Sequence, residues 1–422
     1  MKTSVLFLFL LLAVSNTNAQ FDTISHVNQV IRDMIVYDNK LFIGGNFTTL
    51  QDTIQSYWTA YYNGTEMKRQ TAVIYGGGPR KFAIFDNDLY SVGDWEFLAD
   101  SDIGVAKWNG SFGNWVQGGL WENGSHTNYW SMVADGNYLY IATSNGHILR
   151  RTPDMPFETF RNTSTGGNVS IFEMIMYQGK LCVMGNFTTL EGVPVRNIAL
   201  WNGTTWEALG TGVASSVSSA VIYQNELYVA GSFVEAGGVP AKKIAKWNGT
   251  SWSDVGGSVT GTSANGIRDL VPCGNLLFAV GDFDGIGGQT ANDIASWDGL
   301  QWTTYNLPHS ESILGSGAEY NGRLYFGGWN FTRSHVYGYS GNFLSLNEFA
   351  ATPVEIYPNP SNGIFTLSDN YKGTSYEVFN SLGQTILTDN QALIDLSGME
   401  NGVYLLRFLN SNSEIIRLTK NW

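Results

Sequence analysis

Short alternations of apolar and polar residues, broken by Asn, Gly and Asp, run through most of this chain. The clearest unit spans residues 218–256. It has apolar segments at 218–223 and 227–233, a loop of about ten residues, and two further segments, 244–247 and 252–255, on either side of an Asn-Gly pair. Alternation with a period of two predicts strands, and Asn-Gly is a strong hairpin signal. The unit is therefore predicted to be four antiparallel strands.

The same pattern recurs along the chain, with a leucine at the matching position of each copy. These leucines are Leu41, Leu89, Leu139, Leu181, Leu227, Leu277 and Leu324. Their spacing of 42 to 50 residues suits four short strands per repeat. The copy that begins near Trp130 is the most degenerate. Tandem four-stranded units of this kind are expected to be arranged in a ring, and a ring must close or expose an edge. We therefore expect residues 21–24 to supply the outer strand of the last unit, with 342–346 as the alternative.

Tryptophan pairs flank the Asn-Gly or Asp-Gly turn in three copies. The pairs are Trp201 with Trp206, Trp247 with Trp252, and Trp297 with Trp302. A large ring at a repeating position favours packing between neighbouring units. The alternative, an aromatic platform for sugars, is less consistent with such regular repetition.

The composition adds limits on the partners. A formal net charge of −13 argues against nucleic acid, whose phosphates need a cationic surface, and against an anionic membrane surface. The 49 glycines and 14% aromatic residues fit an all-β protein with many tight turns. Cys182 and Cys273 lie at different positions of their repeats and are not expected to form a disulfide.

The N-terminus has the features of a signal peptide over residues 1–19. Lys2 is followed by the apolar run Val5–Val14, and Thr17-Asn18-Ala19 is a small-residue cleavage site. The mature chain would begin at Gln20. The apolar run is too short to span a bilayer, and no transmembrane segment is predicted in the mature chain.

The repeats resemble the kelch family of propellers. The resemblance rests on the glycine doublets Gly44-Gly45 and Gly327-Gly328 and on the aromatic pairs around the last turn of each unit. Most copies have Ala-Gly, Met-Gly or Val-Gly instead of the doublet. The resemblance implies a seven-bladed kelch-like β-propeller over residues 20–347. It implies little about activity, because one fold serves many functions.

A different pattern begins after a linker at 348–353. Short alternating segments separated by Pro, Asn and Gly predict a small immunoglobulin-like β-sandwich over residues 354–422. An accessory β-sandwich without a sorting role is the alternative.

This segment resembles the C-terminal sorting domain of type IX secretion cargo from the Bacteroidetes. The residues that carry the resemblance are Tyr357, Pro358, Asn359, Pro360, Gly363, Asn380, Gly383, Gly402, Tyr404 and Lys420. The resemblance implies delivery through the periplasm to the type IX translocon and sorting machinery. It also implies release, or attachment to surface lipopolysaccharide, after processing.

No catalytic signature was found around the five histidines, and no catalytic residue is predicted. A secreted carbohydrate-active enzyme would have to use loop acids such as Glu96, Asp100 or Glu173. Asp282 and Asp284 offer oxygen ligands for calcium, although solvated acidic loops explain them as well. No other cofactor is expected. The recurring Asn-x-Thr triplets are interpreted as turn residues.

Aligning the copies gives one candidate ligand site. Arg32, Arg80, Trp130, Phe172 and Arg268 begin the predicted innermost strands and would surround one mouth of the ring, on the face of the long loops. Arginines and aromatic rings there could bind an anionic or sugar ligand. The alternative is that the arginines pair with Asp33, Asp269 and loop carboxylates.

These observations predict an exported binding or adhesion protein with a glycan or protein ligand. The alternatives are a secreted hydrolase or lyase and a structural component of a surface layer.

Overall fold

The computed structural model contains two compact units, residues 1–342 and 343–422, and each is described by itself. The structure describes residues 21–339 and 356–420 except for several short segments. Those segments are 57, 71–73, 98–103, 111–113, 120–128, 165–168, 262, 264–265, 306, 308–312, 330–333, 358–360, 368–374, 381–384 and 409–414. The predicted signal peptide (1–19), the predicted linker (348–353) and the alternative closing segment 342–346 lie outside the described residues.

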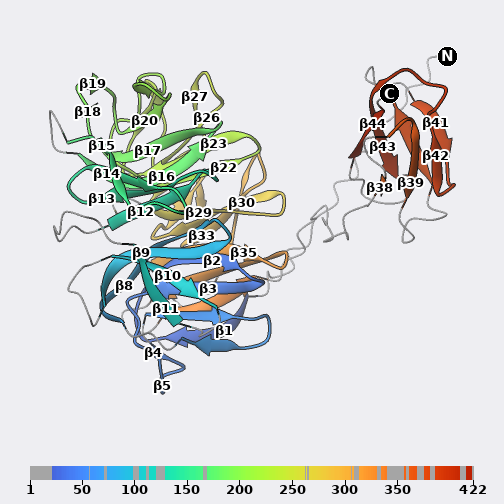
Figure 1. Cartoon of the computed structure of the whole chain (residues 1–422). Helices are drawn as coiled ribbons and strands as arrows, with labels where there is room; N and C mark the ends of the chain where they lie inside the picture. Colours follow the sequence, from blue (N-terminus) through green and yellow to red (C-terminus); the bar gives the residue numbers. More distant parts are fainter. Residues whose placement is uncertain are drawn as a thin grey trace, which may run out of the picture. The chain divides into compact units, whose positions relative to one another are not determined.

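The first unit is built from antiparallel sheets of four successive strands (Figure 1). Within the described residues six sheets have this order, and in a seventh the fourth strand comes from the N-terminal segment and is followed by two short strands. Their first strands are β2 (Ile31–Tyr37), β8 (Ile74–Phe85), β12 (Tyr129–Ala134), β16 (Ser170–Tyr177), β22 (Val217–Tyr223), β29 (Ile267–Cys273) and β35 (Ile313–Tyr320). Their second strands are β3 (Lys40–Gly45), β9 (Asp88–Phe97), β13 (Leu139–Thr143), β17 (Lys180–Asn186), β23 (Glu226–Gly231), β30 (Leu276–Gly281) and β36 (Arg323–Trp329).

The outer half of each sheet follows the loop between the second and third strands. The third strands are β6 (Thr59–Tyr62), β10 (Val105–Asn109), β14 (His147–Arg151), β20 (Ile198–Trp201), β26 (Ile244–Trp247), β33 (Ile294–Trp297) and β37 (Ser334–Tyr339). The outermost strands are β7 (Met67–Arg69), β11 (Asn114–Gly119), β15 (Glu158–Asn162), β21 (Trp206–Ala208), β27 (Trp252–Asp254), β34 (Trp302–Thr304) and β1 (Phe21–Val27).

Contacts between consecutive first strands run from β2 through β8, β12, β16, β22 and β29 to β35, and from β35 back to β2. The sheets therefore form a closed ring with the first strands innermost, which is the arrangement of a β-propeller. Closure depends on β1, which pairs with β37 from Phe21 opposite Tyr339 to Val27 opposite Ser334. The predicted role of the N-terminal segment is confirmed.

The turns follow from residues that tolerate positive φ. Gln224 and Asn225, between β22 and β23, have φ of 49° and 63°, as a two-residue hairpin turn with matching twist requires. At the outer turn of the fourth sheet, Asn202 Oδ1 accepts hydrogen bonds from the backbone N–H groups of Thr204 and Thr205, both at 2.9 Å. Gly203 there has φ of 102°. This Asn-Gly-Thr triplet is turn chemistry, as predicted.

The core lies between adjacent sheets. Trp252 of β27 donates from Nε1 to the carbonyl of Leu209 in the preceding repeat at 2.7 Å, and Trp302 of β34 does the same to Val255 at 2.8 Å. Each tryptophan pair is buried with ring centroids 5.3 Å apart. The predicted packing role of these rings is confirmed.

Short hairpins occupy several loops between second and third strands. They are β4 (Thr49–Leu50) with β5 (Ile54–Gln55), β18 (Thr189–Leu190) with β19 (Val193–Pro194), β24 (Glu235–Ala236) with β25 (Val239–Pro240), and β31 (Gly285–Ile286) with β32 (Gln289–Thr290). The hairpin at β31 also pairs with β28 (Val259–Thr260), which precedes the innermost strand of its sheet. These loops and the starts of the innermost strands therefore share one face.

The second unit consists of two sheets. One contains β38 (Ile356–Tyr357), β39 (Ile364–Leu367) and β42 (Leu393–Asp395), and the other contains β41 (Thr385–Asp389), β40 (Tyr376–Phe379), β43 (Gly402–Phe408) and β44 (Ile415–Lys420). Phe365, Leu367 and Ile394 of the first sheet form one buried cluster with Val378 and Leu406 of the second. The two sheets therefore share a core.

No helix in the described part of the chain is long and apolar enough to cross a membrane.

Candidate functional site

A β-bulge interrupts the innermost strand of every sheet of the first unit near its start. In the second sheet, for example, the pairing with β9 jumps from Pro79 to Lys81 and leaves Arg80 as the extra residue. We call the extra residues the bulge layer. They are Arg32, Arg80, Trp130, Phe172, Ser218 and Arg268, together with Gly315, which with Ser316 lies opposite a single residue of the partner strand. The candidate residues named from the sequence all belong to this layer.

Three of these residues pack on one another across consecutive sheets. The guanidinium carbon of Arg80 lies 5.2 Å from the ring centroid of Trp130, and the ring of Trp130 lies 5.3 Å from that of Phe172. Trp130 keeps 37% of its surface exposed. Arg268 is exposed, and Arg32 is partly buried at the equivalent position of the first sheet. The structure therefore brings Arg80, Trp130 and Phe172 together.

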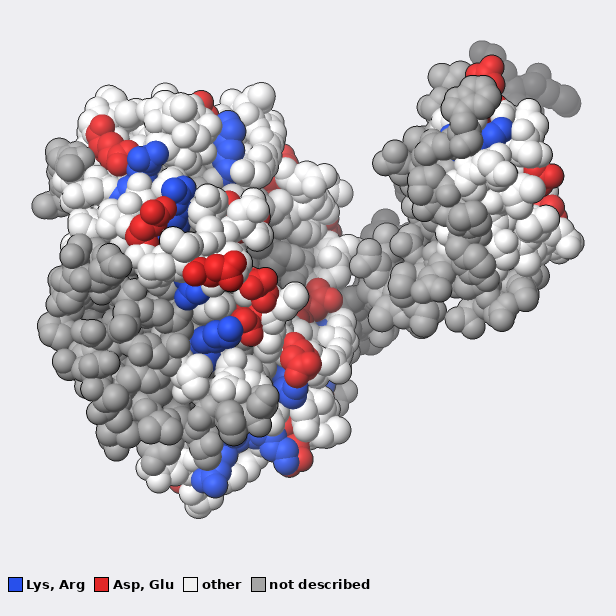
Figure 2. All heavy atoms as spheres, viewed as in Figure 1, with Lys and Arg blue, Asp and Glu red and all other residues white. Residues whose placement is uncertain are grey.

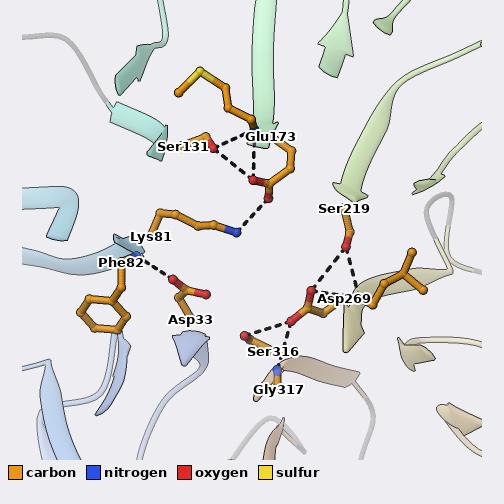
Figure 3. Close-up of polar contacts among 11 residues, drawn as sticks. Asp33, Lys81, Phe82, Ser131, Glu173, Ser219, Asp269, Ser316 and Gly317 are labelled. Atoms are coloured by element: carbon orange, nitrogen blue, oxygen red, sulfur yellow. Dashed lines mark hydrogen bonds and ion pairs between the residues drawn. The ribbon is translucent and has the colours of Figure 1, made fainter. Parts of the chain in front are cut away.

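The residue after each bulge is polar and points toward the axis of the ring. This axial layer consists of Asp33, Lys81, Ser131, Glu173, Ser219, Asp269 and Ser316 (Figure 3). Lys81 Nζ lies 2.9 Å from Glu173 Oε2, and Ser131 Oγ lies 3.2 Å from Glu173 Oε1. On the other side of the axis, Asp269 accepts hydrogen bonds from Ser219 at 3.3 Å and Ser316 at 3.2 Å.

Several axial side chains accept a hydrogen bond from the neighbouring sheet in the same way. Asp33 accepts from the backbone N–H of Phe82 at 2.6 Å, and Asp269 accepts from that of Gly317 at 3.1 Å. Ser131 and Ser219 accept from the corresponding N–H groups of Met174 and Leu270 at 3.0 and 3.2 Å. Each donor follows the axial residue of its own sheet. A buried N–H without a partner is costly, so these side chains hold adjacent sheets together.

Burial and neighbouring charges change the protonation of this layer. Burial raises the pKa of Asp33 to about 7, although Lys81 and the N–H of Phe82 act against the rise. Burial also raises the pKa of Asp269. For Lys81, burial alone would lower the pKa, but Glu173, Asp33 and Asp269 together raise it, so the ammonium stays charged. The layer is a structural polar network with one firmly held cation.

The alternative considered from the sequence was that the arginines pair with Asp33, Asp269 and loop carboxylates. Asp33 accepts a hydrogen bond from a backbone N–H of the neighbouring sheet, and Asp269 accepts from a backbone N–H and from a serine on each side. The ion pair of the axial layer is formed by Lys81 and Glu173. Alignment of the repeats within the chain already showed polar residues in this register. They did not show that the side chains reach from one sheet to the next.

The enzyme alternative named three acids. Glu173 lies in the axial layer, where its carboxylate binds Lys81 and Ser131. The side chain of Glu96 and the whole of Asp100 lie outside what the structure describes.

The calcium hypothesis concerned Asp282 and Asp284. Asp284 Oδ1 accepts a hydrogen bond from Thr260 Oγ1 at 2.9 Å. Among the described side chains, no group of three or more His, Cys, Asp or Glu residues is placed to hold a metal ion. The two cysteines, Cys182 and Cys273, are buried and unpaired.

The sorting motif forms part of the core and edges of the second unit. Tyr357 lies in β38, Gly402 and Tyr404 in β43, and Asn380 directly follows β40. Lys420 is buried, and its Nζ donates to the carbonyls of Ser397, at 2.8 Å, and Met399. Pro358, Asn359, Pro360 and Gly383 lie outside the described residues.

Residues 355–419 match the family described as the secretion system C-terminal sorting domain. The match confirms the sorting domain of type IX secretion inferred from the motif, and it indicates export to the cell surface or secretion. No curated protein matches the chain.

Solved structures match over most of the chain at low identity. The chain is similar to PorZ, a surface component of the type IX secretion system of Porphyromonas gingivalis, with 14% identity and a TM-score of 0.51, covering 92% of this chain and 58% of that one. It is also similar to an extracellular domain assigned to a hybrid two-component system of B. thetaiotaomicron, with 13% identity and a TM-score of 0.53, covering 96% and 59%. A third, YCF48 from Cyanidioschyzon merolae, has 12% identity and a TM-score of 0.50, covering 76% and 99%.

The chain spans less than two thirds of the length of the first two structures. At these identities the likeness concerns the fold alone.

Proposed function

We propose that this protein is an exported, non-enzymatic binding protein of the cell surface or the medium, whose ligand binds at the bulge layer of a seven-bladed kelch-like propeller. In this proposal each four-stranded sheet is one blade, and the second unit is an immunoglobulin-like sorting domain. The observation that carries the proposal is the stack of Arg80, Trp130 and Phe172 on the face where the loops gather.

The bulges give this surface its chemistry. A bulge places one extra side chain on the strand and redirects it. Here it adds a second set of side chains beside the axial layer, and that set contains three arginines and two aromatic rings. Guanidinium groups bind carboxylates or sulfates through paired hydrogen bonds, and the exposed face of Trp130 can pack on a sugar ring. The ligand proposed is an acidic glycan or an acidic segment of a surface protein.

The rigid axial layer supports a binding role. Its hydrogen bonds fix the start of each innermost strand, so the bulge layer is presented without a large ordering cost. In the same network, Glu173 binds Lys81 and Ser131. Glu173 is one of the acids named for the enzyme alternative. Surface lipopolysaccharide is proposed as a partner after processing of the sorting domain.

The test is retention of labelled acidic and neutral glycans and surface proteins on an array by mature protein carrying R32A, R80A and R268A together. We expect binding of an acidic ligand by the parent protein and at least a tenfold loss in the triple variant, since several charge-assisted contacts are removed. Turnover of each retained glycan is followed by reducing-end release.

The matched control removes three other cations that pair with acids at the surface, through K40A, K68A and R196A. It makes the same change in net charge and should bind as the parent does. Equal retention by the two triple variants would refute the bulge-layer site, and release of reducing ends would favour the enzyme alternative.

A further inference from the structure

A cavity of about 550 Å³ opens between the third and fourth sheets of the first unit. Its walls come from the β12–β13 and β16–β17 turns, from β14 and β15, and from the β20–β21 turn. Because the innermost strands start at the bulge layer and end at these turns, the cavity lies on the opposite face of the ring. A volume of this size suits a small ligand.

The cavity lies at the degenerate third repeat, where the contact with the next sheet differs from that of later repeats. In the fifth and sixth sheets, a glycine after the preceding outermost strand lies against a tryptophan. A Cβ on Gly210 would lie 3.4 Å from the ring of Trp247, and one on Gly256 would lie 2.3 Å from that of Trp297. At Trp201 of the fourth sheet, the preceding strand β15 supplies the guanidinium of Arg161 instead, 3.8 Å from the ring centroid.

A second bulge directs an aromatic side chain into the same place. The pairing of β14 with β15 jumps from Arg161 to Thr159, so Phe160 is the extra residue. Its ring centroid lies 4.5 Å from the guanidinium carbon of Arg150 and 4.7 Å from that of Arg161. Aromatic rings and guanidinium groups therefore alternate along the wall, from Arg150 through Phe160 and Arg161 to Trp201, and Arg150 also packs on Tyr138 outside the lining.

Stacking of this kind fixes the planes of the guanidinium groups and leaves their in-plane N–H groups available as donors. Glu158 engages only Nε of Arg150, at 2.7 Å. The Nε of Arg161 is buried without a hydrogen-bond acceptor among the described residues, and its nearest carboxylate, Glu191, lies 3.9 Å away. Lys180 adds an ammonium at the rim, 3.2 Å from Glu207.

The mixture of charges restricts the ligand. The lining contains three cations, Arg150, Arg161 and Lys180, and two carboxylates, Asp135 and Glu158, together with Thr159 and Asn202. Figure 2 shows basic and acidic side chains beside one another on the visible surface of the first unit. The carboxylates would repel a dense polyanion, whereas they accept hydrogen bonds from hydroxyl groups. One carboxylate on a ring of hydroxyls fits both sets of groups.

We propose that this cavity is a second binding site, separate from the bulge layer, for an acidic sugar of a uronate-containing oligosaccharide. The sugar carboxylate binds Arg161 and Arg150, and its hydroxyls bind Asp135, Asn202 and Glu158. The ring packs against Phe160.

The experiment is calorimetric titration of the full mature chain with trigalacturonate, with maltotriose as the neutral probe. Trigalacturonate should bind, and maltotriose should bind at least tenfold more weakly. R161A should weaken trigalacturonate binding at least tenfold. Since Arg161 also packs on Trp201, K180Q serves as a second variant that touches no ring, and it should weaken binding about threefold. A melting curve for each variant identifies loss of fold.

R196A is the matched control, because Arg196 is an exposed arginine paired with Glu235 outside the cavity, and it should bind trigalacturonate as the parent does. The triple variant of the bulge layer should also retain this binding, which separates the two sites. Absence of trigalacturonate binding by the parent, equal binding of the two probes, or parent-like binding by folded R161A and K180Q would each overturn the proposal.

Discussion

A single residue inserted into each innermost strand shapes the chemistry of both layers at the axis. Without the bulge at Arg32, the residue that follows would take the other face of the strand, because side chains alternate. With the bulge, the side chains of Arg32 and Asp33 both lie at the same end of the ring. Asp33 is thereby placed beside Lys81 and the N–H of Phe82, in an environment where burial opposes its charge.

A pH dependence of stability follows from Asp33. Its pKa is about 7 in the folded protein and near 3.8 in the unfolded chain, so the folded state holds the proton more tightly. This contribution to stability is present below pH 4 and is lost as the pH rises through 7. Relative to that of D33N, the free energy of unfolding of the parent should fall by about 1 kcal/mol or more between pH 5 and pH 8, measured by urea unfolding.

The asparagine keeps an oxygen that can accept from Phe82, so D33N should fold normally. D33A removes that acceptor and should be less stable than D33N at every pH. A parent and D33N whose unfolding midpoints change in parallel with pH would show that Asp33 does not titrate in this range.

At the scale of elements, closure of the ring depends on a strand from the N-terminal end of the first unit, which completes the last sheet. β1 covers the edge of β37, and Arg323 of β36 also binds Asp22 at 2.6 Å. Val27 and Ser25 of β1 are buried. An uncovered edge would offer unpaired N–H and C=O groups to another chain.

Deleting residues 21–27 should lower the melting temperature by roughly 10 °C, because several ladder hydrogen bonds and the burial of Val27 are lost. It should also produce dimers or larger species, measured by light scattering after size exclusion. T23A, at an exposed position of the same strand, is the control and should melt as the parent does. A monomeric deletion variant with unchanged melting would mean that another segment closes the ring.

At the scale of the whole molecule, the chain combines a propeller-like ring of sheets with a sorting domain. The sorting domain is the part of the chain whose role a family match supports. We expect its fold to depend on Gly363. This residue has φ of 112°, and a Cβ there would lie 2.9 Å from Ser397 Cα and 3.0 Å from Lys420 Cε. Only glycine fits such a position without strain.

G363A should therefore disrupt the second unit and reduce the amount of protein at the surface or in the medium at least tenfold, in a host with the type IX system. Immunoblots of periplasmic and external fractions measure the effect. G398A is the matched control, because a Cβ at Gly398 meets nothing within 4 Å, and it should be exported normally. Normal export of G363A would show that the sorting signal does not require this fold.

The sequence by itself determined the repeating strands, their turns and the sorting motif, because alternation, Asn-Gly turns and matching leucines are local properties of the chain. It also predicted that residues 21–24 close the ring, since an open edge is unfavourable. Only the tertiary structure decided that Asp33, Lys81 and Glu173 meet at the axis, because their meeting depends on bulges and on the curvature of a closed ring. The cavity at Phe160 and Arg161 also depends on register, since one extra residue in β15 redirects the side chains that form its wall.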